Sequence, residues 1–332
     1  MNELEQNILA IIQDAFPLEE RPYRVLAEQL GSDEQSIFAA VENLRQSGII
    51  RRIGGVYDSK KLGFISRLCA GKVPTVSTGA SDDSALDAFA AAVNEIPAIT
   101  HNYVRSHEYN VWFTVIARSE AEIQKIVDEV CSKTKLHDVH ILDATKKFKI
   151  NTVMGAAVPA NRIGDEKRHC EPKAKHSPAR ILSANDKACI RIACTDIPHT
   201  LTPFKDWGVS CDELRDDIAQ KRMRRFGAIL RHQEAGFAYN AMVCFANSEF
   251  GFQNSELKKA GEILASKPYI SHCYERPSFE GFPYTLYAML HAQSAEELDR
   301  NIKEAAASIG NPDYAVLHSL HELKKTSFRF FA

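Results

Sequence analysis

The chain has 332 residues, 45% of them hydrophobic, and its 41 basic and 43 acidic side chains leave a formal net charge of −2. This balance gives no general electrostatic reason to expect nucleic acid as a partner, and the length allows about two domains of ordinary size. No apolar run approaches the ~20 residues of a membrane span, and the acidic start of the chain lacks a signal-peptide pattern, so we expect a cytoplasmic protein. The eight cysteines show no metal-site spacing, so we expect reduced thiols and no metal site.

The first 60 residues have the pattern of a winged helix-turn-helix. Apolar residues at helical spacing predict helices over 3–15, 22–30 and 32–46, the last of them capped by Ser32. An apolar strand is expected over 49–57. Three short helices followed by such a strand predict a winged helix-turn-helix over 1–60.

Residues 61–155 change to strands that alternate with helices. The predicted elements run in the order βαββαβ, over 66–73, 82–95, 99–105, 109–117, 119–132 and 139–150. That order, with antiparallel central strands, predicts a ferredoxin-like domain. Residues 156–180 hold three prolines among many charges and no apolar periodicity, which is typical of a linker or of the scar of a gene fusion.

The second half repeats this plan. We expect a second, shortened winged helix-turn-helix over 181–233 and a second ferredoxin-like domain over 234–332. The expected elements of that domain are 238–246, 255–266, 270–276, 284–292, 295–307 and 314–324. The predicted fold class is therefore α+β, with two tandem repeats that each join a winged helix-turn-helix to a ferredoxin-like domain.

One stretch carries the repeat most clearly. Residues 224–237 answer residues 51–64, and in each copy two arginines lead an apolar run, a glycine ends a turn, and a second apolar run resumes. This pattern predicts a β-hairpin in each copy. Where the second copy has Arg231-His232, the first has Asp58-Ser59, which indicates that the two halves do different work.

A winged helix followed by a ferredoxin-like domain resembles the leucine-responsive/AsnC family of transcription regulators, whose domains dimerise and sense small metabolites. The predicted helix over 32–46, which would read the DNA bases in such a regulator, argues against that function here. It carries Asp33, Glu34 and Glu42 with Arg45 as its lone arginine, and residues 210–220 are equally acidic. Because DNA phosphates repel such a surface, DNA is not an expected partner.

Several segments resemble the siroheme decarboxylases, an offshoot of that regulator family, in a form that fuses two normally separate subunits. In the second half these segments are 225–232, 235–243, 271–277 and 281–289. In the first half they are 51–58, 61–64, 101–103 and 109–114. The resemblance covers nearly all of the chain outside the linker.

The resemblance implies the loss of carbon dioxide from the acetate side chains at C12 and C18 of siroheme, giving 12,18-didecarboxysiroheme. That product lies on routes to heme b and to heme d1, and fused pairs of this sort resemble those of the heme d1 route. No cofactor is expected, because the macrocycle can act as its own electron sink and the iron belongs to substrate and product. The implied partners are siroheme, further siroheme decarboxylase subunits and the other half of the chain in an internal pseudo-dimer, with a homo-oligomer left open.

The candidate substrate-binding residues follow from the eight carboxylates at the rim of siroheme, which call for arginines around an apolar slot. Arg225 and Arg231 lie six positions apart, so a regular strand would place both on one face. Both are carboxylate-clamp candidates, the alternative being a solvated strand face. His232 and Arg52 complete this group, and we expect one productive site per chain, built chiefly on the second half and completed by the first.

The candidate catalytic residues lie on matching strands. His101, Tyr103 and Arg105 in the first half answer His272, Tyr274 and Arg276 in the second, at alternate positions that share one strand face. A histidine or tyrosine could act as general acid, and a histidine could instead sit over the iron. Arg105 and Arg276 are assigned to substrate binding.

The remaining aromatic and histidine residues are weighed as structural. Trp112, Phe113 and Tyr287 are expected in an ordinary core, and Tyr284 is assigned to substrate binding. His291, His318 and His321 are expected to be surface or structural residues. Two alternatives to the enzyme stay open from the residues alone: a DNA-binding regulator, and a sensor that binds a tetrapyrrole without reaction.

Overall fold

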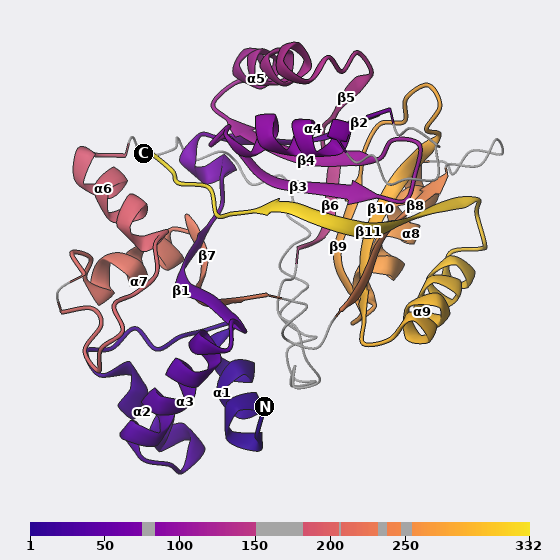
Figure 1. The fold of residues 1–332 in the computed structure, drawn as a ribbon. Coiled ribbons are helices and arrows are strands. Elements are labelled where there is room, and N and C mark those ends of the chain that lie inside the picture. The colour runs from indigo at the N-terminus through magenta and orange to yellow at the C-terminus, as the bar shows by residue number, and fades with distance from the viewer. Residues whose placement is uncertain (75–83, 151–181, 206, 232–237, 247–253) are drawn as a thin grey trace. The chain divides into compact units, whose positions relative to one another are not determined.

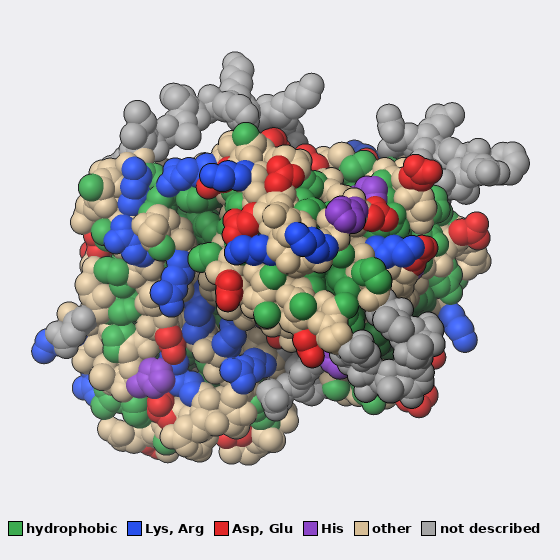
Figure 2. Space-filling model, turned by 45° about the horizontal axis from the view of Figure 1, so that its top comes forward, with side chains coloured by type: hydrophobic (Ala, Val, Ile, Leu, Met, Phe, Trp, Pro, Cys, Tyr) green, Lys and Arg blue, Asp and Glu red, His purple; other side chains and the backbone are tan. Residues whose placement is uncertain are grey.

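The computed structural model describes residues 1–74, 84–150, 182–205, 207–231, 238–246 and 254–332 (Figure 1). The chain forms two compact units, each of which takes residues from both halves of the sequence. The first unit comprises 1–62, 153–235 and 329–332, and the second comprises 63–152 and 236–328. Within the described part of the chain, no helix combines the length and the apolar character that crossing a membrane requires. Figure 2 shows basic and acidic side chains interspersed over the visible face.

The first unit contains the helices of both predicted winged domains. From the first half come α1 (Glu3–Ile12), α2 (Pro22–Leu30), α3 (Glu34–Gln46), β1 (Ile50–Tyr57) and the short 3-10 helix η1 (Lys60–Leu62). From the second half come α6 (Ala184–Ala193), α7 (Cys211–Ala219) and β7 (Met223–Leu230). We expected Ser32 to cap α3. The N-cap is instead Asp33, whose carboxylate accepts a hydrogen bond from Ser36 N. As predicted, α7 is shorter than its counterpart α3.

Within the described residues, which leave out 232–237 of the second copy, the repeated stretch does not form the two hairpins that the sequence predicted. Instead, β1 and β7 pair with each other as an antiparallel two-stranded sheet, in which Gly54 lies opposite Gly227. The strand β2 (Ile65–Gly71) that follows β1 joins a different sheet. The prediction was wrong because the apolar pattern specifies a strand but leaves its partner open. Pairing between repeats ties the two winged domains into one unit.

The second unit contains both predicted βαββαβ domains, which confirms the fold class. The first is built from β2, α4 (Ser84–Asn94), β3 (Ile99–Arg105), β4 (Val111–Ala117), α5 (Glu120–Thr134) and β5 (Val139–Leu142). The second is built from β8 (Tyr239–Ala246), α8 (Asn254–Ser266), β9 (Ile270–Glu275), β10 (Tyr284–Ala292), α9 (Ala295–Ser308) and β11 (Tyr314–Lys325). Figure 1 shows α4 and α5 on one side of the strands of this unit, and α8 and α9 on the other.

The last strand of each domain crosses to the other domain. In β11, Tyr314–His318 pair with β8 and the stretch from Ser319 to Lys325 pairs with β3. In the first half the single strand predicted over 139–150 is divided: β5 pairs with β2, and β6 (Lys146–Ile150) pairs with β9. The resulting nine-stranded order is β5-β2-β4-β3-β11-β8-β10-β9-β6. Because three residues separate β5 from β6, the two ends of this order lie close together, and the sheet curves back on itself.

Three apolar clusters hold the second unit together. One packs beneath α8 and α9 and includes Phe245 and Leu290, and another packs beneath α4 and α5 and includes Phe113. The third joins strands of both repeats and includes Trp112 and Tyr287, whose ring centroids are 6.4 Å apart. The pseudo-dimer expected from the sequence is therefore formed through a shared core and through the two strand crossovers.

Candidate functional site

The predicted catalytic residues of the first half form a row along β3. The rings of His101 and Tyr103 are stacked, with centroids 6.3 Å apart and planes at 25°. The guanidinium carbon of Arg105 lies 5.2 Å from the centroid of the Tyr103 ring, a cation–π arrangement. His101 Nδ1 lies 2.9 Å from Thr100 Oγ1. The row therefore runs from a half-buried imidazole to a buried guanidinium.

The row on β9 repeats this geometry. His272 and Tyr274 stack with centroids 6.1 Å apart and planes at 21°, and Arg276 lies 5.1 Å from the Tyr274 ring. His272 Nδ1 is 2.9 Å from Ser271 Oγ. The two halves have kept one local structure around these residues, although neighbouring positions have diverged, as at Asn102 and Cys273.

Both rows share a sheet face with the core that joins the repeats. Tyr103 lies opposite Trp112 on the neighbouring strand, and Tyr274 lies opposite Tyr287. Trp112 and Tyr287 belong to the shared core cluster. Because cross-strand partners lie on the same face of a sheet, both rows line the interior face of the second unit. The structure thus brings the two predicted catalytic rows to one core.

Arg105 and Arg276 lie at the two strand crossovers. Arg105 Nη1 donates to Leu317 O at 3.1 Å and to Ser319 Oγ at 3.0 Å, where β11 changes partner. Arg276 Nη1 donates to Leu142 O at 2.7 Å, at the end of β5. Burial lowers the pKa of Arg105 to about 10 and also lowers the pKa of Arg276. These contacts make both arginines supports of the crossovers.

Tyr284 begins β10 at the edge of the shared core. Its ring centroid lies 4.7 Å from that of Phe282 in an edge-to-face arrangement, and burial raises the pKa of its hydroxyl. It lies on the same unit as both rows. Trp112, Phe113 and Tyr287 are core residues, as expected.

The predicted arginines of the first unit have mirrored environments. Arg225 Nη1 donates to Gln13 O, at the C-terminus of α1, and to Ala228 O at 3.2 Å. Arg52 donates to Thr195 O at 3.5 Å, beyond the C-terminus of α6, and to Gly55 O at 3.2 Å. Each guanidinium therefore meets carbonyls at a helix C-terminus of the other repeat, where a positive charge is favoured. Burial lowers the pKa of each to about 10.

The two ends of the β1–β7 pair differ in charge. At one end Asp58 N donates to Arg222 O at 2.8 Å, and the Asp58 carboxylate lies 3.4 Å from Arg224 Nη2. At the other end the equivalent main-chain bond runs from Arg231 N to Ile49 O at 3.0 Å. Arg231 is exposed, so a cation stands where the first end has its carboxylate. His232, the next predicted residue, lies outside the described part of the chain.

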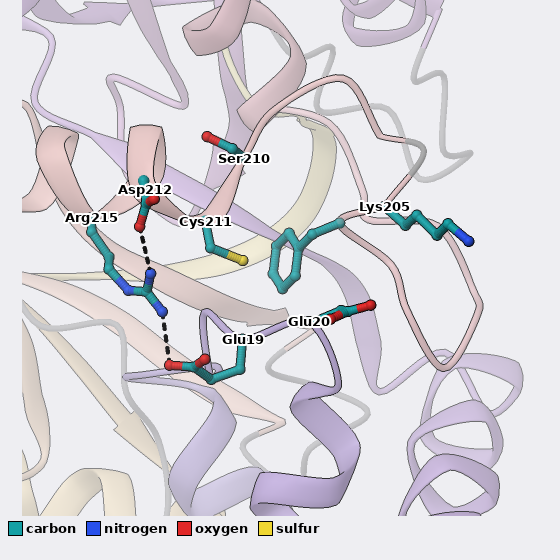
Figure 3. A pocket seen from close by; sticks show the side chains of 8 residues that line it. Glu19, Glu20, Lys205, Ser210, Cys211, Asp212 and Arg215 are labelled. Atoms are coloured by element: carbon teal, nitrogen blue, oxygen red, sulfur yellow. Dashed lines mark hydrogen bonds and ion pairs between the residues drawn. The ribbon is translucent and has the colours of Figure 1, made fainter.

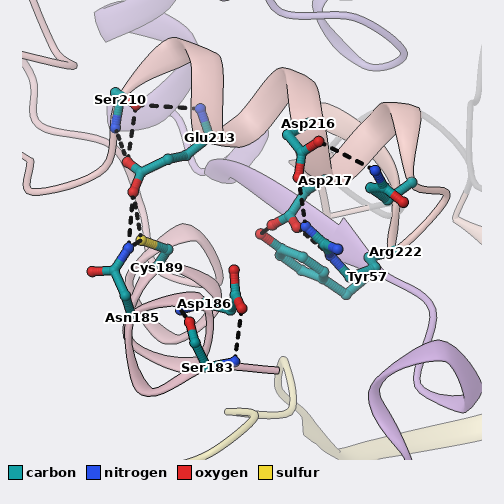
Figure 4. A network of polar contacts seen from close by, with 11 residues as sticks. Tyr57, Ser183, Asn185, Asp186, Cys189, Ser210, Glu213, Asp216, Asp217 and Arg222 are labelled. Atoms are coloured by element: carbon teal, nitrogen blue, oxygen red, sulfur yellow. Dashed lines mark hydrogen bonds and ion pairs between the residues drawn. The ribbon is translucent and has the colours of Figure 1, made fainter. Parts of the chain in front are cut away.

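The acidic end is further neutralised by a network around α7. Arg222 Nε lies 2.6 Å from Asp217 Oδ1, and Arg222 Nη2 lies 2.8 Å from Asp216 Oδ2 (Figure 4). Tyr57 Oη also donates to Asp217, at 2.6 Å. The positions in the first repeat that match Asp216 and Asp217 hold Asn43 and Leu44. The network therefore belongs to one end of the strand pair.

A hollow of about 360 Å³ lies elsewhere in the first unit, between α7 and the loop before α2 (Figure 3). Its charged lining consists of Glu19, Glu20, Asp212, Lys205 and Arg215. Arg215 is already bound to Asp212 and Glu19, at 2.7 Å each. Three acids against two cations make this hollow unsuitable for a molecule rimmed with carboxylates.

The lone arginine of the predicted reading helix is engaged inside the first unit. Arg45 Nη1 lies 2.5 Å from Asp196 Oδ2, its Nε lies 3.3 Å from Glu42, and its side chain is 6% exposed. Asp196 Oδ1 also accepts from Ile53 N. An arginine held in this way is not available to read a base edge, which agrees with the expectation that DNA is not a partner of this helix.

Two arrangements were missed by the sequence reasoning. Ser271 Oγ lies 2.9 Å from both His272 Nδ1 and His291 Nε2, although His291 was expected only as a surface or structural residue. His140 Nε2 lies 2.7 Å from Asp138 and 3.4 Å from Tyr109 Oη. The alternation of Asp138 and His140 was a weak local signal. The contact with His291 depends on strand pairing and left no signal in the sequence.

The duplicated fold and the paired rows define a protein of the AsnC-like class. The model of the AsnC-like ligand binding domain matches residues 61–149 and 234–324, and that of the siroheme decarboxylase NirDL-like HTH domain matches residues 5–51. The siroheme decarboxylase of Hydrogenobacter thermophilus is 30% identical over 100% of this chain and 96% of its own. The chain belongs to the siroheme decarboxylase family.

Two further relatives bear on the architecture. The alpha subunit of the siroheme decarboxylase of Desulfovibrio desulfuricans is 45% identical over 45% of this chain and 82% of its own length, so it matches only half of the duplication. The crystal structure of the siroheme decarboxylase NirDL with an iron-uroporphyrin III analogue is 26% identical, with a TM-score of 0.66 over 99% of this chain and 95% of that one.

Proposed function

We propose that this chain removes carbon dioxide from two acetate side chains of siroheme and yields 12,18-didecarboxysiroheme. The observation that carries the proposal is the pair of matching His–Tyr–Arg rows on β3 and β9, which both line the interior face of one unit. Membership in the siroheme decarboxylase family and the tetrapyrrole analogue bound by the NirDL structure support the choice of substrate.

The residues of the rows suit the proton step of such a reaction. When the bond to the carboxyl carbon breaks, its electron pair stays on the methylene carbon and is delocalised into the macrocycle, and carbon dioxide leaves. That carbon must then receive one proton. His101, His272, Tyr103 and Tyr274 are the described candidates, because imidazole and phenol groups can donate a proton from a fixed position. The macrocycle serves as the electron sink, so the proposal includes no further cofactor.

Recognition of the substrate needs cations that face its carboxylates. Arg52, Arg225, Arg105 and Arg276 already contact main-chain carbonyls. Arg231 is exposed at the end of β7, where no carboxylate stands at the position that matches Asp58. We therefore propose that Arg231 binds a carboxylate of the substrate. The four buried or half-buried arginines support the surrounding main chain.

The test is anaerobic incubation of the chain with siroheme, followed by mass analysis of the tetrapyrrole. The proposal expects the loss of two carbon dioxide units, with a singly decarboxylated species on the way. A tetrapyrrole that stays bound and unchanged would identify a sensor and refute the enzyme. A gel shift with duplex DNA at low salt tests the alternative that the chain is a transcription regulator. That alternative requires a complex with DNA that weakens as salt is added.

A further inference from the structure

The two rows differ in the hydrogen-bond partners of the hydroxyl group that lies beside the histidine. In the second repeat the buried hydroxyl of Ser271 bridges two imidazoles, with 2.9 Å to His272 Nδ1 and 2.9 Å to His291 Nε2. His291 is itself buried, on β10. The hydroxyl also lies 3.4 Å from Met289 O. A chain of hydrogen bonds therefore leads from the row into the interior of this repeat.

The first repeat lacks the second imidazole at the matching place. Thr100 Oγ1 lies 2.9 Å from His101 Nδ1, as Ser271 does from His272. The strand pairing of Tyr103 with Trp112 and of Tyr274 with Tyr287 sets the equivalence of β4 and β10. Four positions after Trp112 stands Ile116, and four positions after Tyr287 stands His291. The position that matches His291 thus holds an apolar side chain in the first repeat, which offers no ring nitrogen to the hydroxyl of Thr100.

This difference decides which histidine can hold a proton for transfer. An imidazolium donates from both ring nitrogens, so the hydroxyl beside Nδ1 must accept, and its own proton needs another acceptor. For His272, Nε2 of His291 is that acceptor. The first repeat has no ring nitrogen at the matching position, so the hydroxyl proton has a stronger acceptor in the second repeat and the charged form is better supported at His272 than at His101.

We propose that His272 is the proton donor of the decarboxylation and that Ser271 and His291 are positioning residues that fix its Nδ1–H form; the inference rests on the proposed function. His272 Nε2 delivers one proton to the methylene carbon as that carbon takes the electron pair of the broken bond and carbon dioxide departs. His272 is left neutral with its proton on Nδ1, and solvent restores the proton on Nε2 between turnovers. His101 serves to bind or orient the substrate.

The experiment compares Ser271→Ala with its structural twin Thr100→Ala in the full chain. Ser271→Ala and His291→Gln are expected to lower kcat for siroheme by about 10- to 100-fold with KM little changed, because general acid catalysis contributes on that scale. Thr100→Ala is expected to keep kcat close to that of the parent, and Ser271→Thr, which retains the hydroxyl, is expected to recover most of the loss. Equal losses in Ser271→Ala and Thr100→Ala would overturn the proposal, and so would a change confined to KM.

A second measurement is independent of turnover. Nitrogen chemical shifts of the His272 ring report which ring nitrogen carries the proton, and the proposal expects Nδ1–H in the parent chain and a mixture in Ser271→Ala. If the parent chain shows this form but releases no carbon dioxide, the decarboxylase function fails and the hydrogen-bond arrangement stands. If the chain is active and the His272 tautomer does not depend on Ser271, the arrangement fails alone.

Discussion

At the scale of single residues, the duplicated arginines have acquired separate tasks. Arg52 and Arg225 neutralise the carbonyl ends of helices from the opposite repeat. Arg224 meets the carboxylate of Asp58, whereas Arg231 stands where Asp58 stands in the other copy. One substitution between the copies therefore changes an ion-paired end of the β1–β7 pair into a cationic one.

Replacing Arg231 by Asp should weaken the binding of siroheme by about 10- to 100-fold, because one hydrogen bond to a charged group is lost and a repulsive carboxylate is added. The measurement is an anaerobic titration followed by the absorbance of the tetrapyrrole. Arg224→Ala is the matched control, since Arg224 is an arginine of the same strand pair that already has an acidic partner. Equal affinities for Arg231→Asp and the parent chain would contradict the assignment of Arg231.

At the scale of elements, β1 and β7 can pack closely against helix ends of the opposite repeats because each strand carries a glycine where the two strands pair, Gly54 in β1 and Gly227 in β7. A Cβ atom at Gly227 would stand 2.4 Å from Ile12 O, and one at Gly54 would stand 2.4 Å from Thr195 O. Both obstacles are main-chain atoms. The close approach of helix ends to this strand pair thus requires glycine at both positions.

Gly227→Ala should destabilise the protein by about 1–3 kcal/mol, the usual cost of inserting atoms into packed structure. Chemical unfolding of the variant measures this difference. Gly55→Ala is a milder control, because its nearest obstacles are the side chains of Tyr57 and Met223 and because the matching position already holds Ala228. Unchanged stability in Gly227→Ala would show that α1 does not approach the strand as closely as the structure has it.

The strand crossovers, one within β11 and one between β5 and β6, give a second prediction about the elements. We expect Arg105→Met and Arg276→Met to cost about 1–3 kcal/mol each, because each leaves a crossover carbonyl without its donor. Thermal unfolding measures the loss, and siroheme binding by the folded variants separates support from recognition. Affinity reduced in proportion to the number of arginines removed, with stability intact, would make these residues carboxylate clamps instead.

At the scale of the whole molecule, the chain is built as two repeats joined end to end. The halves are connected by the pairing of β1 with β7, of β3 with β11 and of β6 with β9. Each half by itself would expose the edges of these strands, and unpaired edges promote aggregation. The relatives named as alpha subunits match only half of the chain, which agrees with this view.

Cutting the gene between codons 156 and 180 and expressing both parts together should therefore give a stable complex of the two halves that retains decarboxylation. Size-exclusion chromatography and mass analysis of the tetrapyrrole measure both outcomes. Each half expressed alone is the control and should be insoluble or inactive. Two halves that fold separately and remain apart in solution would contradict the role of the shared strands.

The sequence by itself determined the local elements and the duplication. Apolar periodicity predicted the helices and strands, because each element must bury one face, and the repeated His–Tyr–Arg pattern predicted two rows on matching strand faces. The family resemblance rested on the same repeated residues. These features are local, so they can be read within short stretches of the chain.

Only the tertiary structure decided which strands pair and which side chains meet. The pairing of β1 with β7, the division of residues 139–150 into two strands and the crossover contacts of Arg105 and Arg276 all join residues far apart in the sequence. The bridge from His272 through Ser271 to His291 arises in the same way. A strand pattern shows which face is buried but does not name the neighbour, because main-chain hydrogen bonds are the same for every partner.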